Sequence, residues 1–468
     1  MKRLLLAVFL VLSTLIYAQD MPVRLPSIIS NHMVLQQSVN ARLWGWGPAT
    51  KKIAIVGSWA PKDTVSALVA DECIWEATIK TPKAGGPYTI QFINGDDIVT
   101  VNDVLIGEVW LCSGQSNMAL PCNENILDKG NVLQEPPNNN MRFFMVDFAF
   151  DIYPRSDCKG KWVICDSSTL SWFSAVGFFF GRTLQKQLQA PVGLIGAYAG
   201  ATRIQPWTPG YIIQRDTALS ALSKNIGTAW APQGVSILYN GMIHPLTPYS
   251  LSGAIWYQGE TNACVTAEAK SYGKMLRGLI SGWRNAFKSD LPFYFVQIAP
   301  FDGYYPRYAA AYLREQQATA LVLPNTGMVC VGDLVDSVKD IHPRLKAGVG
   351  ARLANLALKE QYHVSDIVNP YHPRFAKMEI KGQSAIITVT ASGKLTSRDK
   401  DMLNFQIAGN DQVFYPAKAI MDKNGNIVLQ SKNVKAPVAA RYCFSNEAIP
   451  GLFDTNGLPL IPFRTDNW

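Results

Sequence analysis

The residues best suited to chemistry in this 468-residue chain are a serine and a histidine that lie far apart in the sequence. Ser116 stands in the run Gly-Gln-Ser-Asn-Met at 114–118, a tight turn between an apolar strand-like segment and a short helix. A serine there has an exposed hydroxyl and a free backbone amide at a helix N-terminus. His342, followed by proline, can take the serine proton and pass it to a leaving alcohol. Helix capping is the structural alternative for each residue, but together they indicate acyl transfer.

An acyl-transfer site also needs hydrogen-bond donors for the negative charge that develops on the carbonyl oxygen. Gly200 and Gln258 each follow another apolar segment, so their backbone amide and side-chain carboxamide join the Ser116 amide as candidate donors. Glycine at position 200 allows close approach of the backbone to a substrate. Glu260 and Asn262 lie just beyond Gln258. We expect them to hold this turn by hydrogen bonds, with direct contact to substrate as the alternative role.

Five apolar segments in the middle of the chain have the length and composition of buried strands: Val104–Cys112, Val192–Ala197, Gly253–Tyr257, Phe293–Ile298 and Met328–Val331. Segments with helical periodicity alternate with them: Ser174–Leu188, Tyr272–Phe287, Arg307–Leu321 and Arg344–Leu358. This alternation predicts an α/β fold, with a parallel sheet covered by helices on both faces. Ligands bind beyond the carboxyl ends of the strands in such sheets. The polar turns after four of the five strands therefore meet at one edge.

The segments on either side of this region have short alternating runs broken by glycine, proline and aspartate, which is typical of β structure. The chain is too long for one core. We therefore predict an N-terminal β-sandwich-like domain over 22–103, a catalytic domain over 104–360 and a C-terminal β domain over 367–468. The run Asn94-Gly95-Asp96 predicts a hairpin turn within the first of these domains.

The chain begins with a basic pair, Lys2 and Arg3, and an apolar run that ends at Tyr17-Ala18. Its length and flanks predict a cleavable signal peptide over 1–18, with an uncut N-terminal anchor as the alternative. No later stretch is apolar enough to cross a membrane. We expect a secreted or periplasmic protein.

Composition bounds the partners and cofactors. The chain is 48% hydrophobic and 17% charged, with a formal charge of +8. It has no cluster of Lys and Arg, so we expect no nucleic-acid partner. The eight cysteines form no pair with metal-ligand spacing, and no metal or other cofactor is expected. Cys158 and Cys165 have the spacing best suited to a loop disulfide, whereas Cys112 and Cys330 lie in apolar segments that favour buried thiols.

Three runs resemble the sialate O-acetylesterase family of the SGNH hydrolases: GEVWLCSGQSNM at 107–118, AIWYQGETN at 254–262 and DIHPR at 340–344. The similarity extends to Met33–Gln37 and Pro462–Asp466. The resemblance implies an SGNH, flavodoxin-like sheet and a metal-free esterase that removes acetyl groups from the hydroxyls of sialic acids. It also implies that Ser116 is the nucleophile, His342 the base, and Gly200 and Gln258 the oxyanion donors.

The sequence departs from the family pattern at two places. SGNH enzymes commonly have an aspartate three residues before the base, where this chain has Lys339. We predict Asp340 as the acid; Asp336, a backbone carbonyl or a Ser–His dyad are the alternatives. Relatives often show Trp-Gly-Gly-Thr where this chain has Ala199-Gly200-Ala201-Thr202 preceded by tyrosine, so that one glycine has become Ala201.

The predicted function is therefore removal of acetyl groups from sialic acids through an acetyl-serine intermediate. Arg203 is the candidate for a sialate carboxylate, because a guanidinium binds a carboxylate bidentately. A role in bracing its own loop is the alternative. Two other functions stay open: an acetylesterase acting on xylan or another acetylated glycan, and a glycan-binding protein without catalysis. Cys112 is disfavoured as a nucleophile because it lies within a strand, and His244 lies ahead of a strand, which favours a structural role.

Overall fold

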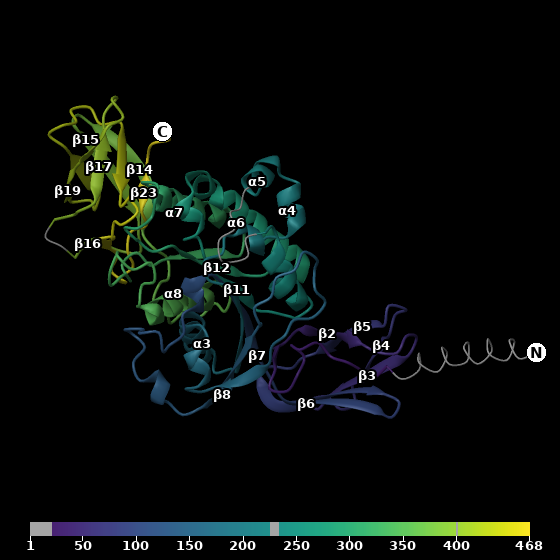
Figure 1. Cartoon of the computed structure of the whole chain (residues 1–468). Coiled ribbons are helices and arrows are strands. Elements are labelled where there is room, and N and C mark those ends of the chain that lie inside the picture. The colour runs from purple at the N-terminus through teal and green to yellow at the C-terminus, as the bar shows by residue number, and fades with distance from the viewer. Residues whose placement is uncertain (1–20, 225–233, 399–400) are drawn as a thin grey trace, which may run out of the picture.

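The computed structural model describes residues 21–224, 234–398 and 401–468. Along these residues, N-terminal strands come first, a sheet with helices on both faces follows, and small antiparallel sheets lie at the C-terminal end (Figure 1). The predicted signal peptide over 1–18 lies outside the described residues. Within the described ranges, no helix is both long and apolar enough to span a membrane.

The central sheet has the strand order β13-β12-β11-β7-β10-β8-β9. Neighbours from β13 to β8 are parallel, and β9 runs antiparallel to β8 at the edge. The bounds are β7 Asp97–Gly114, β8 Asn138–Met145, β9 Trp162–Cys165, β10 Val192–Tyr198, β11 Gly253–Tyr257, β12 Phe293–Gln297 and β13 Thr326–Cys330. All five predicted strands are therefore confirmed, as β7, β10, β11, β12 and β13. The sheet as a whole is mixed, because β9 pairs antiparallel with β8 and the N-terminal strand β6 (Gly85–Asn94) pairs antiparallel with β7.

The strand order places a switch point between β7 and β11. From β7 the chain passes to β10 on one side, and it then returns to β11 on the other side of β7 and continues outward to β12 and β13. Crossover connections that leave a sheet in opposite directions open a crevice at the carboxyl ends of the two central strands. The turns that contain Ser116 and Gln258 follow these two strands.

Both faces of the central strands are covered by helices because their side chains alternate between two apolar layers. On β11, Ala254 and Trp256 belong to one layer, whereas Ile255 and Tyr257 belong to the other. The first layer is completed by α6 (Thr266–Phe287) and α7 (Ala309–Ala318), and the second by α3 (Ala175–Leu188) and α8 (Lys346–Glu360). In Figure 1, α6 and α7 lie across β12 from α8. These four helices correspond to the four that the periodicity predicts.

Four of the six N-terminal strands in the described residues, β1, β3, β4 and β6, are continuous with the central sheet through β7, whereas β2 and β5 form a two-stranded sheet of their own. The bounds of the six strands are β1 Val34–Gln36, β2 Asn40–Trp46, β3 Lys52–Gly57, β4 Val65–Leu68, β5 Ile74–Lys80 and β6 Gly85–Asn94. Strand β6 forms a hairpin with the first half of β7, closed by the pair Asn94–Asp97, which confirms the predicted turn. Strand β7 then runs through the predicted domain boundary between 103 and 104, so one strand anchors the N-terminal region to the sheet that positions Ser116.

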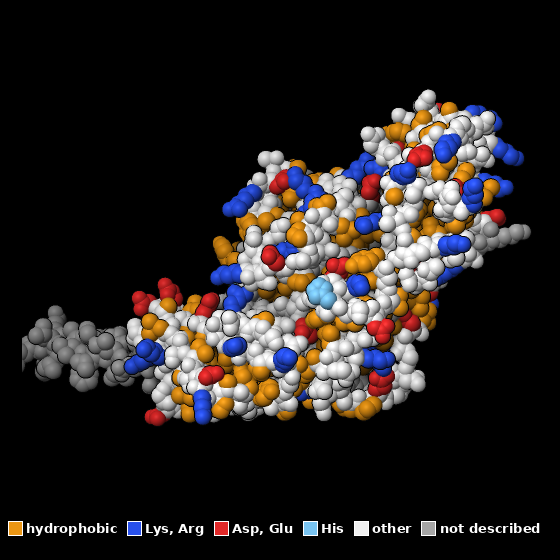
Figure 2. All heavy atoms as spheres, turned by 180° about the vertical axis from the view of Figure 1, so that it is seen from behind, with side chains coloured by type: hydrophobic (Ala, Val, Ile, Leu, Met, Phe, Trp, Pro, Cys, Tyr) orange, Lys and Arg blue, Asp and Glu red, His pale blue; other side chains and the backbone are white. Residues whose placement is uncertain are grey.

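The C-terminal region consists of two four-stranded antiparallel sheets and a two-stranded one. The first contains β14 Arg374–Lys381, β15 Ser384–Thr390, β20 Ile427–Gln430 and β19 Lys418–Met421. The second contains β18 Phe414–Pro416, β17 Phe405–Ala408, β21 Ala439–Tyr442 and β23 Phe463–Arg464, and β16 Thr396–Ser397 pairs with β22 Leu452–Phe453. On the face drawn in Figure 2, basic and acidic side chains are interspersed over this region and the rest of the molecule.

All eight cysteines are free thiols, so the disulfide expected between Cys158 and Cys165 does not form. The physical reason is their placement: Cys158 packs into the apolar layer on one face of the sheet, and Cys165 into the layer on the opposite face. Cys112 and Cys330 are buried, as predicted.

Candidate active site

The structure brings Ser116 and His342 together, although 226 positions separate them in the sequence. His342 Nε2 lies 2.9 Å from Ser116 Oγ. Helix α2 (Ser116–Ala119) begins directly after β7, and Gly114 at the strand end has φ +138°. A Cβ atom on Gly114 would lie 2.1 Å from the carbonyl oxygen of Tyr257 on β11. Only glycine therefore fits where the turn holds Ser116 above the switch point.

Among the described residues, no acid is hydrogen-bonded to the imidazole of His342. The carboxylate of Asp340 accepts a hydrogen bond from the backbone N–H of His342, at 2.8 Å. Asp336 instead accepts from the side chain and backbone of Arg344. Within 21–224, 234–398 and 401–468, neither a carboxylate nor a carbonyl oxygen accepts from Nδ1 of His342. The predicted acid is thus placed on the histidine loop, without a direct bond to the ring.

The electrostatic surroundings of His342 favour its neutral form. Burial lowers the pKa of the His342 imidazole, the nearby charge of Lys346 lowers it further, and the carboxylate of Asp340 opposes both effects. A neutral imidazole accepts a proton, so Nε2 is in the state that a general base needs.

Two backbone N–H groups beside Ser116 have no hydrogen-bond acceptor among the described residues: those of Ser116 itself and Gly200. Gly200 follows β10, and a Cβ atom there would lie 3.6 Å from that of Ser116, so the two backbones approach closely. Ala201, where the resemblance implies a glycine, has φ +55° and so adopts the left-handed conformation that glycine favours. Both amides are available to a developing oxyanion.

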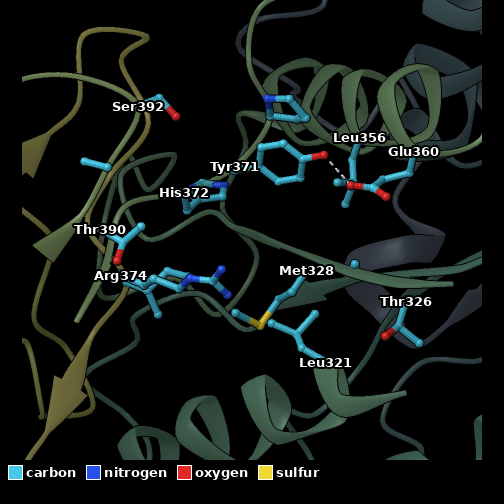
Figure 3. Close-up of a pocket in the computed structure, with 14 residues that line it drawn as sticks. Leu321, Thr326, Met328, Leu356, Glu360, Tyr371, His372, Arg374, Thr390 and Ser392 are labelled. Atoms are coloured by element: carbon cyan, nitrogen blue, oxygen red, sulfur yellow. Dashed lines mark hydrogen bonds between the residues drawn. The ribbon is translucent and has the colours of Figure 1, made fainter. Parts of the chain in front are cut away.

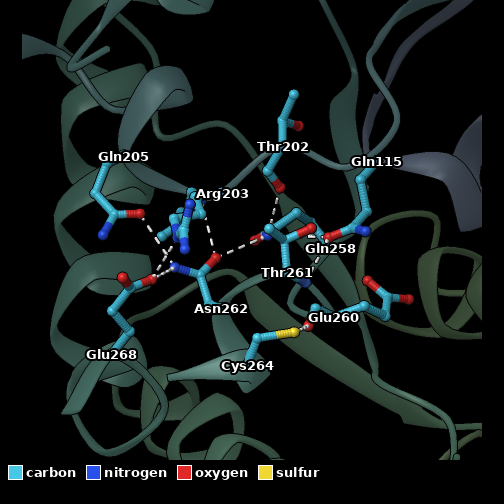
Figure 4. Close-up of polar contacts among 11 residues, drawn as sticks. Gln115, Thr202, Arg203, Gln205, Gln258, Glu260, Thr261, Asn262, Cys264 and Glu268 are labelled. Carbon is cyan, nitrogen blue, oxygen red and sulfur yellow. Dashed lines mark hydrogen bonds and ion pairs between the residues drawn. The ribbon is translucent and has the colours of Figure 1, made fainter. Parts of the chain in front are cut away.

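Gln258 holds the loops in place instead of offering a hydrogen to substrate (Figure 4). Its side chain is fully buried, and its Nε2 group donates to Gln115 Oε1, Thr202 O and Asn262 Oδ1 at 3.1, 3.0 and 2.9 Å. Its Oε1 atom accepts from the hydroxyl of Tyr272 at 2.7 Å. Both amide hydrogens of Gln258 therefore have protein acceptors. Gln258, which the sequence analysis names as a third oxyanion donor, has no hydrogen left to donate to an oxyanion.

Asn262 and Arg203 meet at the carboxylate of Glu268 (Figure 4). Asn262 Nδ2 and Arg203 Nε lie 2.8 and 3.0 Å from Glu268 Oε2. Asn262 Oδ1 also accepts from the backbone N–H of Ile204 at 3.0 Å. Asn262 is 1% exposed, and it joins the loop after β11 to the loop after β10 as the hydrogen-bonding prediction expects.

Glu260 is likewise 1% exposed, and it takes part in a buried group that the sequence analysis missed. Its Oε1 accepts from Asn117 Nδ2 at 2.5 Å, and Asn117 Oδ1 accepts from Lys346 Nζ at 2.6 Å. The sequence signal for Lys346 is its place on the buried stripe of α8, three, four and seven residues before Val349, Gly350 and Leu353. A lysine on such a stripe needs a partner.

The two residues that the sequence disfavours lie outside this arrangement. His244 Nδ1 contacts the carbonyl oxygen of Arg155 at 2.9 Å. Cys112 is buried within β7, and burial raises the pKa of its thiol far above the usual range, which leaves it protonated and unreactive. No group of three or more His, Cys, Asp and Glu side chains in the described part of the chain is arranged to hold a metal ion.

A separate pocket of about 390 Å³ lies near the opposite end of the sheet (Figure 3). Thr326 and Met328 at the amino end of β13 line it together with Tyr371 and Arg374. The hydroxyl of Tyr371 donates to Glu360 across this pocket, at 2.5 Å. The residues that line this pocket include no nucleophile paired with a base, so the acyl-transfer arrangement is that of Ser116 and His342.

Comparisons with known proteins identify the family of the chain. A sequence profile described as "Carbohydrate esterase, sialic acid-specific acetylesterase" matches residues 106–359. The sialate O-acetylesterase of Homo sapiens is 28% identical over 430 residues, which cover 82% of this chain and 80% of the human protein. That of Rattus norvegicus is 27% identical over 451 residues, 82% of each chain. A carbohydrate acetylesterase structure from Xanthomonas citri is 31% identical, with a TM-score of 0.86 over 95% of this chain and 100% of its own.

Proposed function

Because the chain belongs to the sialic acid-specific acetylesterase family of carbohydrate esterases, we propose that it removes O-acetyl groups from sialic acids through an acetyl-serine intermediate. The protein is a carboxylic ester hydrolase. The observation that supports the proposed chemistry is the 2.9 Å contact between Ser116 Oγ and His342 Nε2 beside two backbone amides that lack acceptors.

In the first step, Ser116 Oγ attacks the acetyl carbonyl carbon while His342 Nε2 takes the hydroxyl proton. The carbonyl oxygen becomes an oxyanion that the N–H groups of Ser116 and Gly200 stabilise. The bond between the carbonyl carbon and the sugar oxygen then breaks. His342 gives its proton to that oxygen, and the sugar leaves as an alcohol.

In the second step, a water molecule attacks the acetyl-serine carbonyl, and His342 takes one of its protons. The bond to Ser116 Oγ breaks, the serine regains its proton from His342, and acetate is released. His342 works in this scheme as a Ser–His dyad, with Asp340 holding its backbone.

We assign the fold to the flavodoxin-like SGNH class. The support is the order β10-β7-β11-β12-β13, which places the first strand of the unit between the second and the third. With strands in that order, the crevice at the carboxyl ends of β7 and β11 is the binding position expected for the class.

Substrate choice rests on Arg203, whose side chain is 14% exposed and pairs with Glu268. We propose that it recognises the sialate carboxylate. Arg203→Ala should then raise KM for O-acetylated sialic acid about tenfold or more and leave KM for p-nitrophenyl acetate unchanged, because a charged hydrogen bond contributes roughly 1.5–3 kcal/mol. Equal KM values for the acetylated sialic acid in the variant and the parent would assign Arg203 to bracing its loop.

A second candidate function is acetylesterase activity on a neutral glycan such as acetylated xylan. The similar Xanthomonas citri protein is described as a carbohydrate acetylesterase, a description that includes both acetylated sialic acids and neutral acetylated glycans. Acetate release from O-acetylated mucin sialic acids and from acetylated xylan, measured at equal acetyl concentration, separates the two functions. A higher kcat/KM on xylan would overturn the sialate assignment.

The test of the chemistry is Ser116→Ala. We expect kcat on p-nitrophenyl acetate to fall by about 10³-fold or more, with an unchanged thermal midpoint. A fluorophosphonate probe should label the parent protein and not the variant. Full activity in Ser116→Ala would overturn the proposal, and loss of labelling in a folded parent protein would favour a non-catalytic glycan-binding role.

We also propose export to the periplasm or the medium, from the basic and apolar pattern over 1–18. The mature protein should begin at Gln19. N-terminal sequencing of protein recovered from the periplasmic fraction or the medium of an expression host tests this. An intact Met1 in membrane-bound protein would favour an uncut anchor.

A further inference from the structure

We propose that Lys346, Asn117 and Glu260 form a buried positioning unit that holds the Ser116 turn and the His342 loop at a fixed distance from each other. In this unit Lys346 determines which way the Asn117 carboxamide faces. The inference rests on the proposed function, because it assigns these residues to the same reaction. None of the three touches the reacting atoms in this scheme; each acts through Ser116 or His342.

Asn117 connects the two halves of the site through its side chain. It follows Ser116 directly, and its Nδ2 donates to the carbonyl oxygen of Ile341 at 3.0 Å, one residue before His342. The same Nδ2 donates to Glu260 Oε1 at 2.5 Å. A single carboxamide group therefore ties the turn after β7, the turn after β11 and the histidine loop together.

Lys346 and Glu260 determine which way this carboxamide faces. Lys346 Nζ donates to Asn117 Oδ1 at 2.6 Å, and an ammonium group can only donate. A carboxylate such as that of Glu260 can only accept. The Asn117 oxygen must therefore face Lys346 and its Nδ2 must face Glu260, which also directs Nδ2 at Ile341. With Lys346 replaced by an apolar residue, nothing on that side holds the oxygen.

The cost of burying these groups argues against a purely structural purpose. Burial raises the pKa of Glu260, and Glu260 Oε2 is buried without a hydrogen-bond partner. Burial lowers the pKa of Lys346 to about 7, although the carboxylates of Glu260, Asp340, Asp128 and Asp336 oppose that shift. The Tyr257 ring lies 5.3 Å from Nζ. Apolar residues of similar volume often fill such a space at equal or lower cost, and the proposed role of these buried charged groups is to orient the Asn117 carboxamide.

The test is Lys346→Met, compared with Lys339→Met as a matched control. Lys339 is an exposed lysine three residues before His342. We expect Lys346→Met to lower kcat on p-nitrophenyl acetate about 10- to 100-fold with KM within about threefold, the loss expected for a hydrogen bond from a charged group. Because the ammonium lowers the pKa of His342, the acidic limb of the kcat/KM profile should also move to higher pH in this variant. Lys339→Met should leave both readouts unchanged.

A double-variant cycle with Glu260→Gln separates positioning through Asn117 from general destabilisation. The double variant should be no slower than Lys346→Met alone, because both changes release the same carboxamide. Multiplicative losses, or a Lys346→Met kcat within about twofold of the parent, would overturn the inference. If Lys346→Met does not fold, the kcat of Glu260→Gln tests the inference. An unchanged kcat in that variant overturns the inference, and a lower kcat with unchanged KM and thermal midpoint supports it. An inactive parent, or an active Ser116→Ala, would refute the proposed function instead.

Discussion

The hydrogen bond between Asp340 and His342 goes to the backbone N–H, at 2.8 Å, so Asp340→Asn should cost little activity. Asparagine keeps an oxygen acceptor at the same place and preserves the turn. A hydrogen bond to a carboxylate is worth about 1.5 kcal/mol or more, and Asp340→Ala should therefore lower kcat about tenfold or more. Removal of a carboxylate that is bonded to the catalytic imidazole costs about 10⁴-fold in a Ser-His-Asp triad.

The substitution Asp340→Asn should also shift the pH dependence of kcat/KM in a definite direction. The negative charge of Asp340 raises the pKa of His342, against burial and Lys346, which lower it. Asp340→Asn removes the raising contribution, so the pKa falls further and His342 stays neutral to lower pH. The acidic limb of kcat/KM on p-nitrophenyl acetate should then move to lower pH. A 10³-fold loss of kcat in Asp340→Asn would refute the dyad and restore Asp340 as the triad acid. A limb that moves to higher pH would refute the electrostatic reasoning about Asp340 and His342.

Three further substitutions test how the backbone builds the site. Gly114→Ala should abolish esterase activity in the purified protein, because the added Cβ would lie 2.1 Å from the Tyr257 carbonyl oxygen; activity within about tenfold of the parent would contradict this. Ala201→Gly should raise the free energy of unfolding in urea by about 0.5–1 kcal/mol, because φ is +55° there; a loss of stability would show that contacts of the methyl group outweigh backbone strain. Gln258→Met should lower the free energy of unfolding by roughly 2–4 kcal/mol, because it leaves several buried partners unpaired. A fall in kcat without loss of stability would instead favour Gln258 as an oxyanion donor.

The sheet and its reactive edge could be predicted because strands β10 to β13 are apolar on both faces. Such strands are recognised in a sequence as continuous apolar runs, and the carboxyl ends of parallel strands joined by helices lie at a common edge of the sheet. Ser116 and His342 follow from that topology, since each lies on a turn beyond a strand. The inserted strand β8 was missed because it begins with three asparagines and has Arg142 within its apolar part. The Arg142 side chain is almost fully buried against Asp103, a pairing that single-sequence periodicity does not reveal.

The remaining errors come from contacts between residues distant in the sequence. Cys158 and Cys165 have the spacing of a loop disulfide, but the intervening strand β9 sends them to opposite faces of the sheet. The interpretation of Gln258 as an oxyanion donor required knowing that Gln115 and Tyr272 occupy its polar atoms. A residue's chemical type can suggest a role, but hydrogen-bond capacity is used up by neighbours that only the fold supplies.

The buried carboxamides around Ser116 explain how the described loops at the switch point are held together without further buried charges beyond those of Lys346, Glu260 and Glu268. Each carboxamide both donates and accepts and carries no charge, so its desolvation costs less than that of an ion. The Glu268 carboxylate accepts from Asn262 Nδ2, which leaves Asn262 Oδ1 facing Gln258 Nε2, and that group in turn faces Gln115 Oε1. One carboxylate thus orients three amides in series, up to the residue before Ser116. Glu268→Gln should therefore loosen the nucleophile turn from a distance, because glutamine can face either way.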